Sequence, residues 1–466
     1  MDRRRFLRAG LATVGGAVAL PSFARGALAQ ATGDGPYGSL AGVAPDANGV
    51  ILPPGFASRI VGRAGEPVAD TGYDWPLFPD GAATFDDGDG GWYHVCNSEV
   101  FLAGHGGVSA VHYDADGQAV DAYRILEGSL ANCAGGPTPW GTWLSCEEDF
   151  SEQGLVWECD PTGGEEAVAR PAMGRWAHEA VAVDPHGQRL YLTQDHPEGL
   201  LYRFTPTAYP DLSAGLLEAA IVAADGSVTW AEVPDPSGTT APTRTQVPEA
   251  RPFNGGEGIW HHDGVVFFCT KGDNVVHSID LVAQTYEEVY RAQPAQVADG
   301  SAPLFGVDNI TVDAGTGDLF VAEDGGKMRL VVITPDGTVA PFLQVVGHDG
   351  SELTGPTFNP ARDRLYVSSQ RGPTPRTVRD IDPEVDSDAP AGGVTFEITG
   401  PFRGAAADPE GTTSIPAPTS TLQQAAAATG DDDDLLPFLG VGAAVAVAAG
   451  AATVALRRRR SPSDDA

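Results

Sequence analysis

Short apolar stretches that end in polar residues recur along this chain. Six of them, rich in aromatic and β-branched residues, occupy residues 92–99, 142–149, 190–195, 265–271, 319–324 and 365–370. Four of the five intervals between them are close to about 47 residues, and a second strand precedes most of them across a tight turn. The sequence contains no amphipathic helical pattern of useful length. A unit of about 45 residues with three or four antiparallel strands predicts an all-β fold, a six-bladed β-propeller.

One interval between the repeated strands is longer than the others. It contains residues 206–252, which are rich in Pro, Thr and Ala, and we expect an inserted loop there. The first strand of each predicted pair should be the inner one, next to the propeller axis. Residues at equivalent places in different blades should then converge on that axis.

The two ends of the chain are predicted to lie outside the propeller. Residues 1–29 combine an arginine cluster from Arg3 with an apolar stretch and a small-residue cleavage site, which resembles a twin-arginine export signal. Residues 435–456 form an apolar run that could cross a bilayer as a helix, and residues 457–466 begin with four arginines that favour the cytoplasmic side. The low-complexity residues 404–434 would link this anchor to a propeller ectodomain at 30–403. We therefore expect a cell-membrane protein with one C-terminal pass, an extracellular or periplasmic ectodomain, and the Tat translocon as its partner during export.

Composition agrees with a turn-rich β fold and narrows the choice of ligands. The 466 residues include 59 Gly and 37 Pro, which argues against a helical bundle. The formal net charge of −35 argues against nucleic-acid binding as the function, since nucleic-acid binding requires a basic surface. An acidic surface suits cations, high salt or solubility.

Acidic residues recur where the predicted strand pairs begin and end near the axis. Carboxylates that converge raise one another's pKa, and metal ions relieve the repulsion. Many oxygen ligands favour Ca²⁺ or Mg²⁺, and a nearby thiolate favours a transition metal such as iron. The alternative is that these acids cap strands and face solvent. The candidate metal ligands are Cys133, Glu147, Glu148, Glu179, Glu257, Asp308 and Glu323, with Glu99, Asp195 and Asp324 at comparable strand ends.

The five cysteines divide into two kinds. Cys96, Cys146 and Cys269 occupy the same place in three different strands, which is typical of core positions. Cys159 could form a bridge with Cys146 within one hairpin. Cys133 lies in a glycine-rich strand entry with little apolar context, so it is either a metal ligand or a buried free thiol.

The stretch from Asn132 to Glu148, NCAGGPTPWGTWLSCEE, resembles the signature of the PhoX-type alkaline phosphatases, a twin-arginine-exported family. The likeness extends through residues 174–179 and 306–310, and with the blade spacing it covers about 370 residues. The resemblance implies a six-bladed propeller whose axial cluster of iron and calcium ions hydrolyses phosphate esters. By matched motif, Cys133 would ligate iron and the candidate carboxylates would be metal ligands. The resemblance assigns no catalytic residue.

The sequence departs from the family at one position. Members commonly carry an arginine two residues before the glutamate of the motif that here reads Asn254-Gly-Gly-Glu257, and this chain has Gly255 there. Such an arginine would bind phosphate oxygens and stabilise charge in the transition state. Arg251 is four residues away from Gly255, which corresponds to roughly 13 Å along a strand.

Three functions remain open at this point. The first is a membrane-anchored, metal-dependent phosphatase acting on a phosphate ester. The second is a non-catalytic propeller, stabilised by calcium, that binds an external partner. The third is a calcium-dependent sugar-lactone hydrolase, whose axial site in such propellers uses Glu, Asn and Asp without a thiolate.

Overall fold

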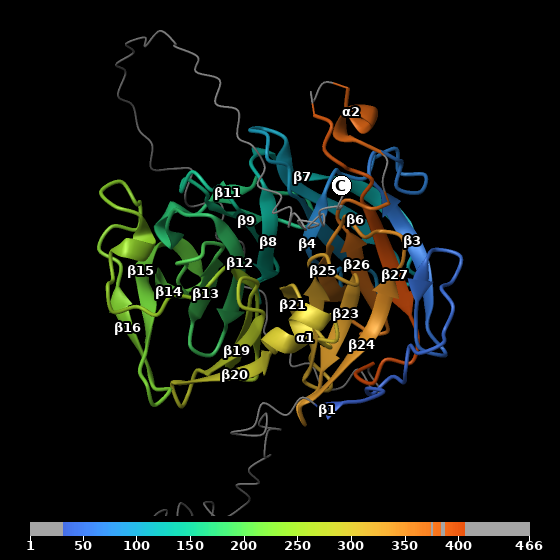
Figure 1. Cartoon of the computed structure of the whole chain (residues 1–466). Helices are drawn as coiled ribbons and strands as arrows, with labels where there is room; N and C mark the ends of the chain where they lie inside the picture. Colours follow the sequence, from blue (N-terminus) through green and yellow to red (C-terminus); the bar gives the residue numbers. More distant parts are fainter. Residues whose placement is uncertain (1–30, 374–375, 384–386, 406–466) are drawn as a thin grey trace, which may run out of the picture. The chain divides into compact units, whose positions relative to one another are not determined.

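The computed structural model describes residues 31–373, 376–383 and 387–405. These residues form six β-sheets, each built mainly of consecutive antiparallel strands (Figure 1). The first strands of the sheets contact one another in the cyclic order β4, β8, β12, β17, β21, β25 and back to β4. The predicted six-bladed propeller is therefore confirmed, and the first strand of each pair is the inner one, next to the axis.

The blades follow the chain order. Blade 1 consists of β4 (Pro79–Asp86), β5 (Trp92–Ser98), β6 (Gly106–Tyr113) and β7 (Ala119–Ser129). Blade 2 consists of β8 (Asn132–Pro137), β9 (Trp143–Glu147), β10 (Val156–Cys159) and β11 (Val168–Ala169). Blade 3 consists of β12 (His178–Asp184), β13 (Arg189–Gln194), β14 (Tyr202–Ala208), β15 (Asp211–Val222) and β16 (Val228–Glu232).

Two of the three remaining blades also include strands from the N-terminal part of the chain. Blade 4 consists of β17 (Gly256–His262), β18 (Val265–Thr270), β19 (Val275–Asp280) and β20 (Thr285–Arg291). Blade 5 consists of β21 (Val307–Asp313), β22 (Asp318–Glu323), β23 (Arg329–Ile333) and β24 (Thr338–Val345), and β24 also pairs with β1 (Ala31–Thr32) and β2 (Val50–Ile51). Blade 6 consists of β25 (Leu353–Phe358), β26 (Arg364–Ser369), β27 (Val394–Thr399) and β3 (Ala57–Arg63).

The expected loop at residues 206–252 is wrong in part. Most of its first half forms β15 and β16, which make blade 3 a five-stranded sheet. The prediction failed because these are the outer strands of the blade. β15 has four consecutive exposed residues, 213–216, and contains Ser, Gly and three Ala, so it lacks the aromatic-rich apolar run that marks the second strands.

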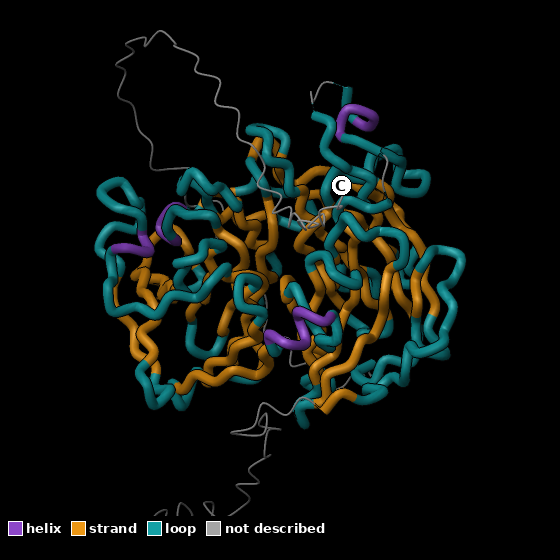
Figure 2. Tube along the Cα trace, viewed as in Figure 1, coloured by secondary structure: helices purple, strands orange, loops and turns teal. Residues whose placement is uncertain are grey.

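Helices are few and short among the described residues (Figure 2). They are α1 (Pro294–Asp299), α2 (Val378–Ile381) and two single 3₁₀ turns at Pro171–Met173 and Thr243–Thr245. Within the described ranges, no helix is both long enough and apolar enough to cross a bilayer. The predicted export signal at 1–29, the low-complexity linker beyond residue 405 and the apolar run at 435–456 all lie outside the described residues.

The apolar core lies between neighbouring blades. Leu144 of β9 in blade 2 and Val181 of β12 in blade 3 meet in one buried cluster that also includes Trp176. Because each blade packs its apolar face on the next, the core is distributed around the ring. It holds the inner strands at fixed spacing about the axis.

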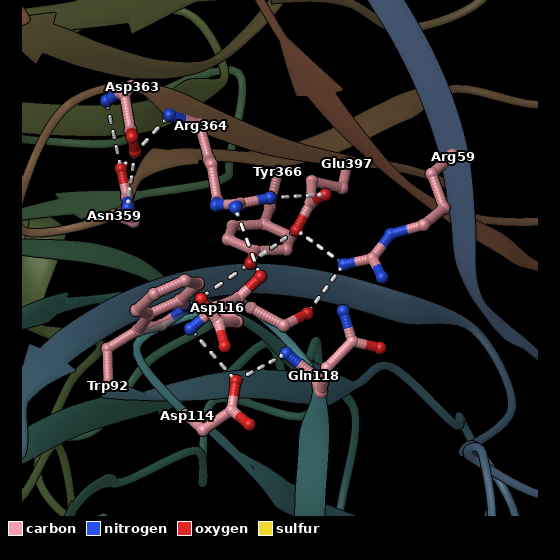
Figure 3. Close-up of polar contacts among 11 residues, drawn as sticks. Arg59, Trp92, Asp114, Asp116, Gln118, Asn359, Asp363, Arg364, Tyr366 and Glu397 are labelled. Atoms are coloured by element: carbon pink, nitrogen blue, oxygen red, sulfur yellow. Dashed lines mark hydrogen bonds and ion pairs between the residues drawn. The ribbon is translucent and has the colours of Figure 1, made fainter. Parts of the chain in front are cut away.

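Closure of the ring depends on a buried carboxylate in blade 6. Glu397 of β27 accepts hydrogen bonds from Arg59 of β3 (2.9 Å), Arg364 of β26 (3.0 Å) and Tyr366 of β26 (2.9 Å), as Figure 3 shows. The same two arginines donate to the carbonyl oxygens of Gly117 and Asp116, in the turn between β6 and β7 of blade 1. Glu397 thus connects the N-terminal strand β3, its own blade and the neighbouring blade.

Candidate metal centre

Each inner strand is interrupted at the same place, close to where it begins. In all six blades the register between the first and second strands shifts, so that two residues of the first strand lie opposite a single residue of the second. Such a bulge re-aims a side chain that would otherwise follow the alternation of the strand. The first bulged residues, in blade order, are Asp80, Cys133, Glu179, Glu257, Asp308 and Gly355.

The second bulged residue is small in most blades because the inner strands approach one another closely there. A Cβ at Gly81 would lie 2.4 Å from Cα of Ala134, and one at Gly258 would lie 2.7 Å from Cα of Asn309. The residues at this level line an axial cavity of only about 20 Å³, which has room for about one water molecule. Backbone and small side chains therefore nearly fill the axis beside the bulges.

A second set of side chains comes from the residue that directly follows the second strand of each blade. These residues are Glu99, Glu148, Asp195, Lys271, Asp324 and Gln370. Together with Glu352, which precedes β25, the two sets form what we call the axial ring. Its members come from all six blades and are far apart in the sequence.

The axial ring contains four overlapping groups that could hold a metal ion. Within each group the potential ligand atoms lie within 4.8 Å of one another. The groups are Asp80–Glu99–Cys133, Cys133–Glu148–Glu179, Glu179–Glu257–Asp308 and Asp308–Asp324–Glu352. Cys133, Glu179 and Asp308 each belong to two groups, so the groups form one continuous chain of ligands.

Several oxygens of the axial ring are buried without a hydrogen-bond partner in the described part of the chain. Both carboxylate oxygens of Glu179 are in this state, and its side chain is fully buried. Oδ1 of Asp80 is also buried without a partner, whereas Gln370 donates to the other oxygen of Asp80 and to Glu99 (2.7 Å). A buried carboxylate that lacks donors is costly unless it is protonated or bound to a cation. The axial ring therefore fits a group of cations bound through oxygen.

Burial and mutual repulsion both disfavour the charged forms of these acids. Burial raises the pKa of Asp80, Glu148, Glu179 and Glu352 well above the usual range, and neighbouring carboxylates add to the shift. Burial also raises the pKa of Asp308 to about 6, although Lys271 opposes the shift. A cation at these positions would displace protons as it binds.

Cys133 is the one thiol of the axial ring. Burial raises its pKa well above the usual range, and the charges of Asp80 and Glu179 raise it further. In these surroundings the thiolate requires a cation beside it. The soft sulfur next to hard carboxylate oxygens suits a transition metal at this end of the ring, beside sites that suit calcium.

The other four cysteines lie elsewhere. Cys96, Cys146 and Cys269 are fully buried in the blades, as expected for core positions. The Cys146–Cys159 bridge does not form, because Cys146 stands opposite Val156 and Cys159 opposite Trp143 on the paired strands. All five cysteines are free.

Five of the seven predicted ligands lie together in the axial ring, namely Cys133, Glu148, Glu179, Glu257 and Asp308. The structure does not bring Glu147 and Glu323 into it. Each of these two is the last residue of a second strand, so the alternation of the strand turns it away from the side taken by the next residue.

Glu147 and Glu323 play the same local part in blades 2 and 5. Glu147 accepts hydrogen bonds from the backbone N–H groups of Leu130 (3.1 Å) and Leu155 (3.0 Å). Glu323 accepts one from the backbone N–H of Phe305 (3.0 Å) and forms a buried ion pair with Arg329 (2.5 Å). Both carboxylates fix the chain segment that leads into an inner strand.

Sequence reasoning missed Asp80 and Glu352 and gave no role to Lys271 or Gln370. A signal existed for Asp80, because a ligand-type residue followed by Gly or Ala marks the bulge in blades 1 to 4. Blade 6 breaks that pattern with Gly355, and nothing in the sequence marks Glu352 as its replacement.

The region around Gly255 faces the axial ring. A Cβ at this position would lie 3.3 Å from Oδ1 of Asp195 and 3.9 Å from Oε1 of Glu257, and the backbone φ is +70°. Arg251 is engaged elsewhere, since its guanidinium lies over the ring of Tyr286 at 4.3 Å and donates to the hydroxyl of that residue.

Comparison with known proteins supports the propeller fold. The family model of alkaline phosphatase PhoX matches residues 93–297, and no curated protein sequence matches the chain. Among solved structures, Pseudomonas fluorescens PhoX in complex with vanadate, a transition-state analogue, is similar with a TM-score of 0.61 and 17% identity, over 78% of this chain and 98% of that one. A gluconolactonase of Xanthomonas campestris gives a TM-score of 0.43 and 14% identity, over 71% of this chain and 88% of that one. Residues 93–297 thus match the family model of alkaline phosphatase PhoX, and the chain shares its propeller fold with a solved PhoX.

Proposed function

We propose that this chain is a metal-dependent phosphatase that hydrolyses phosphate esters at the axial ring. The observation that carries the proposal is the continuous set of buried ligands, in which Glu179 has two carboxylate oxygens without a partner among the described residues. The family match over residues 93–297 supports the phosphatase class, and the PhoX structure with a transition-state analogue shares the propeller.

Iron and calcium are the cofactors that we propose. Cys133, with Asp80, Glu99, Glu148 and Glu179, would hold iron at one side of the axial ring. The carboxylates from Glu257 onward would hold calcium. Bound there, the metals would supply positive charge for the phosphate oxygens and lower the pKa of a bound water.

The chain's own residues determine where an ester can bind. The axis is nearly closed beside the bulges, so a substrate would have to approach the axial ring from the side of the strand-end residues. Lys271 is 36% exposed at that rim and adds an ammonium group to it. The buried carboxylates fix the positions at which metal ions can bind, and their burial keeps bulk water away from those positions.

The test uses two neighbouring glutamates in the purified full-length protein. Glu148→Gln removes a carboxylate of the axial ring, and Glu147→Gln alters its neighbour outside the ring. We expect the wild type to contain iron and calcium and to hydrolyse p-nitrophenyl phosphate. Glu148→Gln should lower metal content and rate at least about tenfold, whereas Glu147→Gln should cost stability and keep both.

The result also distinguishes the alternative functions. Calcium without iron and without hydrolysis of phosphate esters would favour a calcium-stabilised propeller that binds an external partner. Wild-type protein without metal and without hydrolysis would refute the phosphatase proposal.

We further propose that the protein is exported by the Tat translocon and held in the membrane by residues 435–456. The sequence features of the two ends support this proposal. Replacement of Arg3 and Arg4 by Lys should retain the protein in the cytoplasm, and truncation after residue 434 should release a soluble ectodomain. Undiminished surface display of the Lys variant would contradict the export route.

A further inference from the structure

Lys271 stands out among the residues that directly follow the second strands. The equivalent residues of the other blades are two glutamates, two aspartates and one glutamine, whereas blade 4 supplies a lysine. The whole chain has only two lysines, Lys271 and Lys327. A lysine inside a ring of carboxylates therefore calls for a physical explanation.

The ammonium group of Lys271 contacts three carboxylates. Its Nζ lies 3.1 Å from Oε1 of Glu257, 3.3 Å from Oδ2 of Asp324 and 3.6 Å from Oδ2 of Asp308. Burial alone would lower the pKa of Lys271, but the charges of these three residues hold it well above its usual range. The three carboxylates therefore hold a positive charge at this point of the ring.

The backbone fixes the point from which this side chain extends. The N–H of Lys271 donates to the carbonyl of Gly255 (2.9 Å), and the N–H of Gly272 donates to the carbonyl of Asn254 (3.0 Å). Gly255 is the position that faces Asp195 and Glu257 without a side chain of its own. Lys271 thus brings a positive charge to the ring directly beside this position.

The part of the axial ring formed by Cys133, Glu148 and Glu179 lacks a comparable cation among the described residues. Asp80 and Glu99 receive hydrogen bonds from the neutral amide of Gln370, and Arg371 forms its ion pair with Glu352 (2.8 Å). Cys133, Glu148 and Glu179 have no ion pair with a Lys or Arg side chain in the described part of the chain, and the oxygens of Glu179 lack partners. Among the described residues, Lys271 and Arg371 therefore neutralise other parts of the ring and leave the carboxylates beside Cys133 without a counter-charge.

We propose that Lys271 is a resident cation of the axial ring, which takes the place of one metal ion on the Glu257–Asp308–Asp324 side. The side from Glu257 onward would then hold one calcium ion fewer than its carboxylates could bind, and the side with Cys133, Glu148 and Glu179 would keep all of its metal ions. The inference deepens the proposed function, since it assumes that the axial ring binds metal. It assigns Lys271 a role in setting the number of bound ions.

The test counts bound ions, and it does not depend on activity. Full-length wild type, Lys271→Gln, Lys271→Arg and Lys327→Gln are stripped with a chelator and titrated with Ca²⁺, with binding measured by calorimetry and by equilibrium dialysis. Lys271→Gln should bind one more Ca²⁺ per chain than the wild type, because three carboxylates lose their counter-charge. Lys271→Arg, which keeps the charge, should match the wild type, and so should Lys327→Gln, because the ammonium of Lys327 donates to the carbonyl of Gly300 outside the axial ring.

Thermal unfolding gives a second measurement. In chelator, Lys271→Gln should unfold at a lower temperature than the wild type, and added Ca²⁺ should raise its Tm by more than it raises that of the wild type. An unchanged number of ions with an equal calcium-induced rise would overturn the inference. So would a Lys271→Gln protein that fails to fold even with Ca²⁺, because a metal ion should then replace the ammonium.

The outcomes separate this inference from the proposed function. A wild type without metal or phosphatase activity refutes the proposed function, while an additional Ca²⁺ site in Lys271→Gln still supports the role of Lys271. A metal-loaded, active wild type whose ion count is unaffected by Lys271→Gln refutes the inference alone.

Discussion

Replacement of Glu179 by Gln should have opposite effects on stability and on metal binding. Glu179 is fully buried, belongs to two of the four ligand groups and has no hydrogen-bond partner for either oxygen among the described residues. Gln has nearly the same shape as Glu, so the substitution removes only the negative charge and the ionisable proton. The substitution therefore tests whether the carboxylate serves a cation or the fold.

The stability effect follows from linkage between folding and proton binding. Burial, reinforced by the charge of Asp308, raises the pKa of Glu179 well above the usual glutamate value of about 4.5 in the folded protein. Its contribution to stability is therefore fully present below about pH 4.5 and is lost as the pH rises toward the folded pKa. Over that window the loss is about 1.4 kcal/mol per pH unit. In chelator at pH 8, Glu179→Gln should consequently be more stable than the wild type.

The metal effect has the opposite sign. Two unit charges about 4 Å apart contribute about 4 kcal/mol at an effective dielectric constant of about 20. The amide oxygen of Gln remains a weak ligand, so we expect a net loss of about 2–3 kcal/mol. That corresponds to an affinity for Ca²⁺ lower by a factor of about 30 to 150.

The assay is urea unfolding at pH 8, with chelator and with saturating Ca²⁺, together with calcium titration. The matched control is Glu323→Gln, which breaks the ion pair with Arg329 outside the ligand groups. It should lower stability by a similar amount in both conditions and leave Ca²⁺ affinity unchanged. A Glu179→Gln protein that is less stable in chelator, with wild-type Ca²⁺ affinity, would show that Glu179 is a structural residue.

Three further predictions follow from other parts of the structure. Cys133→Ser should remove the colour expected from a thiolate bound to iron and lower the iron content at least about tenfold. The control Cys96→Ser should lower the free energy of unfolding by about 1–3 kcal/mol and keep the metal. Equal iron content in both variants would argue against a thiolate ligand. Glu397→Ala should destabilise the propeller by about 2–4 kcal/mol in urea unfolding, because it removes the acceptor shared by two arginines and a tyrosine. As a control, replacement of the exposed Glu127 by Ala should change the stability by less than about 0.5 kcal/mol. Binding of Ca²⁺ should strengthen as the pH rises through about 6, where Asp308 titrates, and should release protons; a calorimetric heat at pH 6 that is the same in buffers of different ionisation enthalpy would contradict this.

The repeat itself could be predicted from the sequence because the second strands of the blades carry a strong local signal. Their apolar runs with polar ends recur at nearly constant intervals, and each run became the second strand of a blade, such as β5 and β22. The outer strands β15 and β16 were missed, since half-exposed strands with Ala and Ser resemble a loop. The strand β3 was missed as well, because its partner β27 is more than 300 residues away in the chain and no local pattern indicates that pairing.

The candidate centre divides in the same way. Residue type and spacing indicated Cys133, Glu148, Glu179, Glu257 and Asp308 as candidate ligands. Each of them lies at the start of a first strand or directly after a second strand. Only the tertiary structure decided which acid of a neighbouring pair faces the axis, since one step along a strand reverses the direction of the side chain. It also placed Asp80, Glu352 and the ammonium of Lys271 at the ring, because the bulges and the circular closure determine what converges there, and neither is encoded in a local pattern.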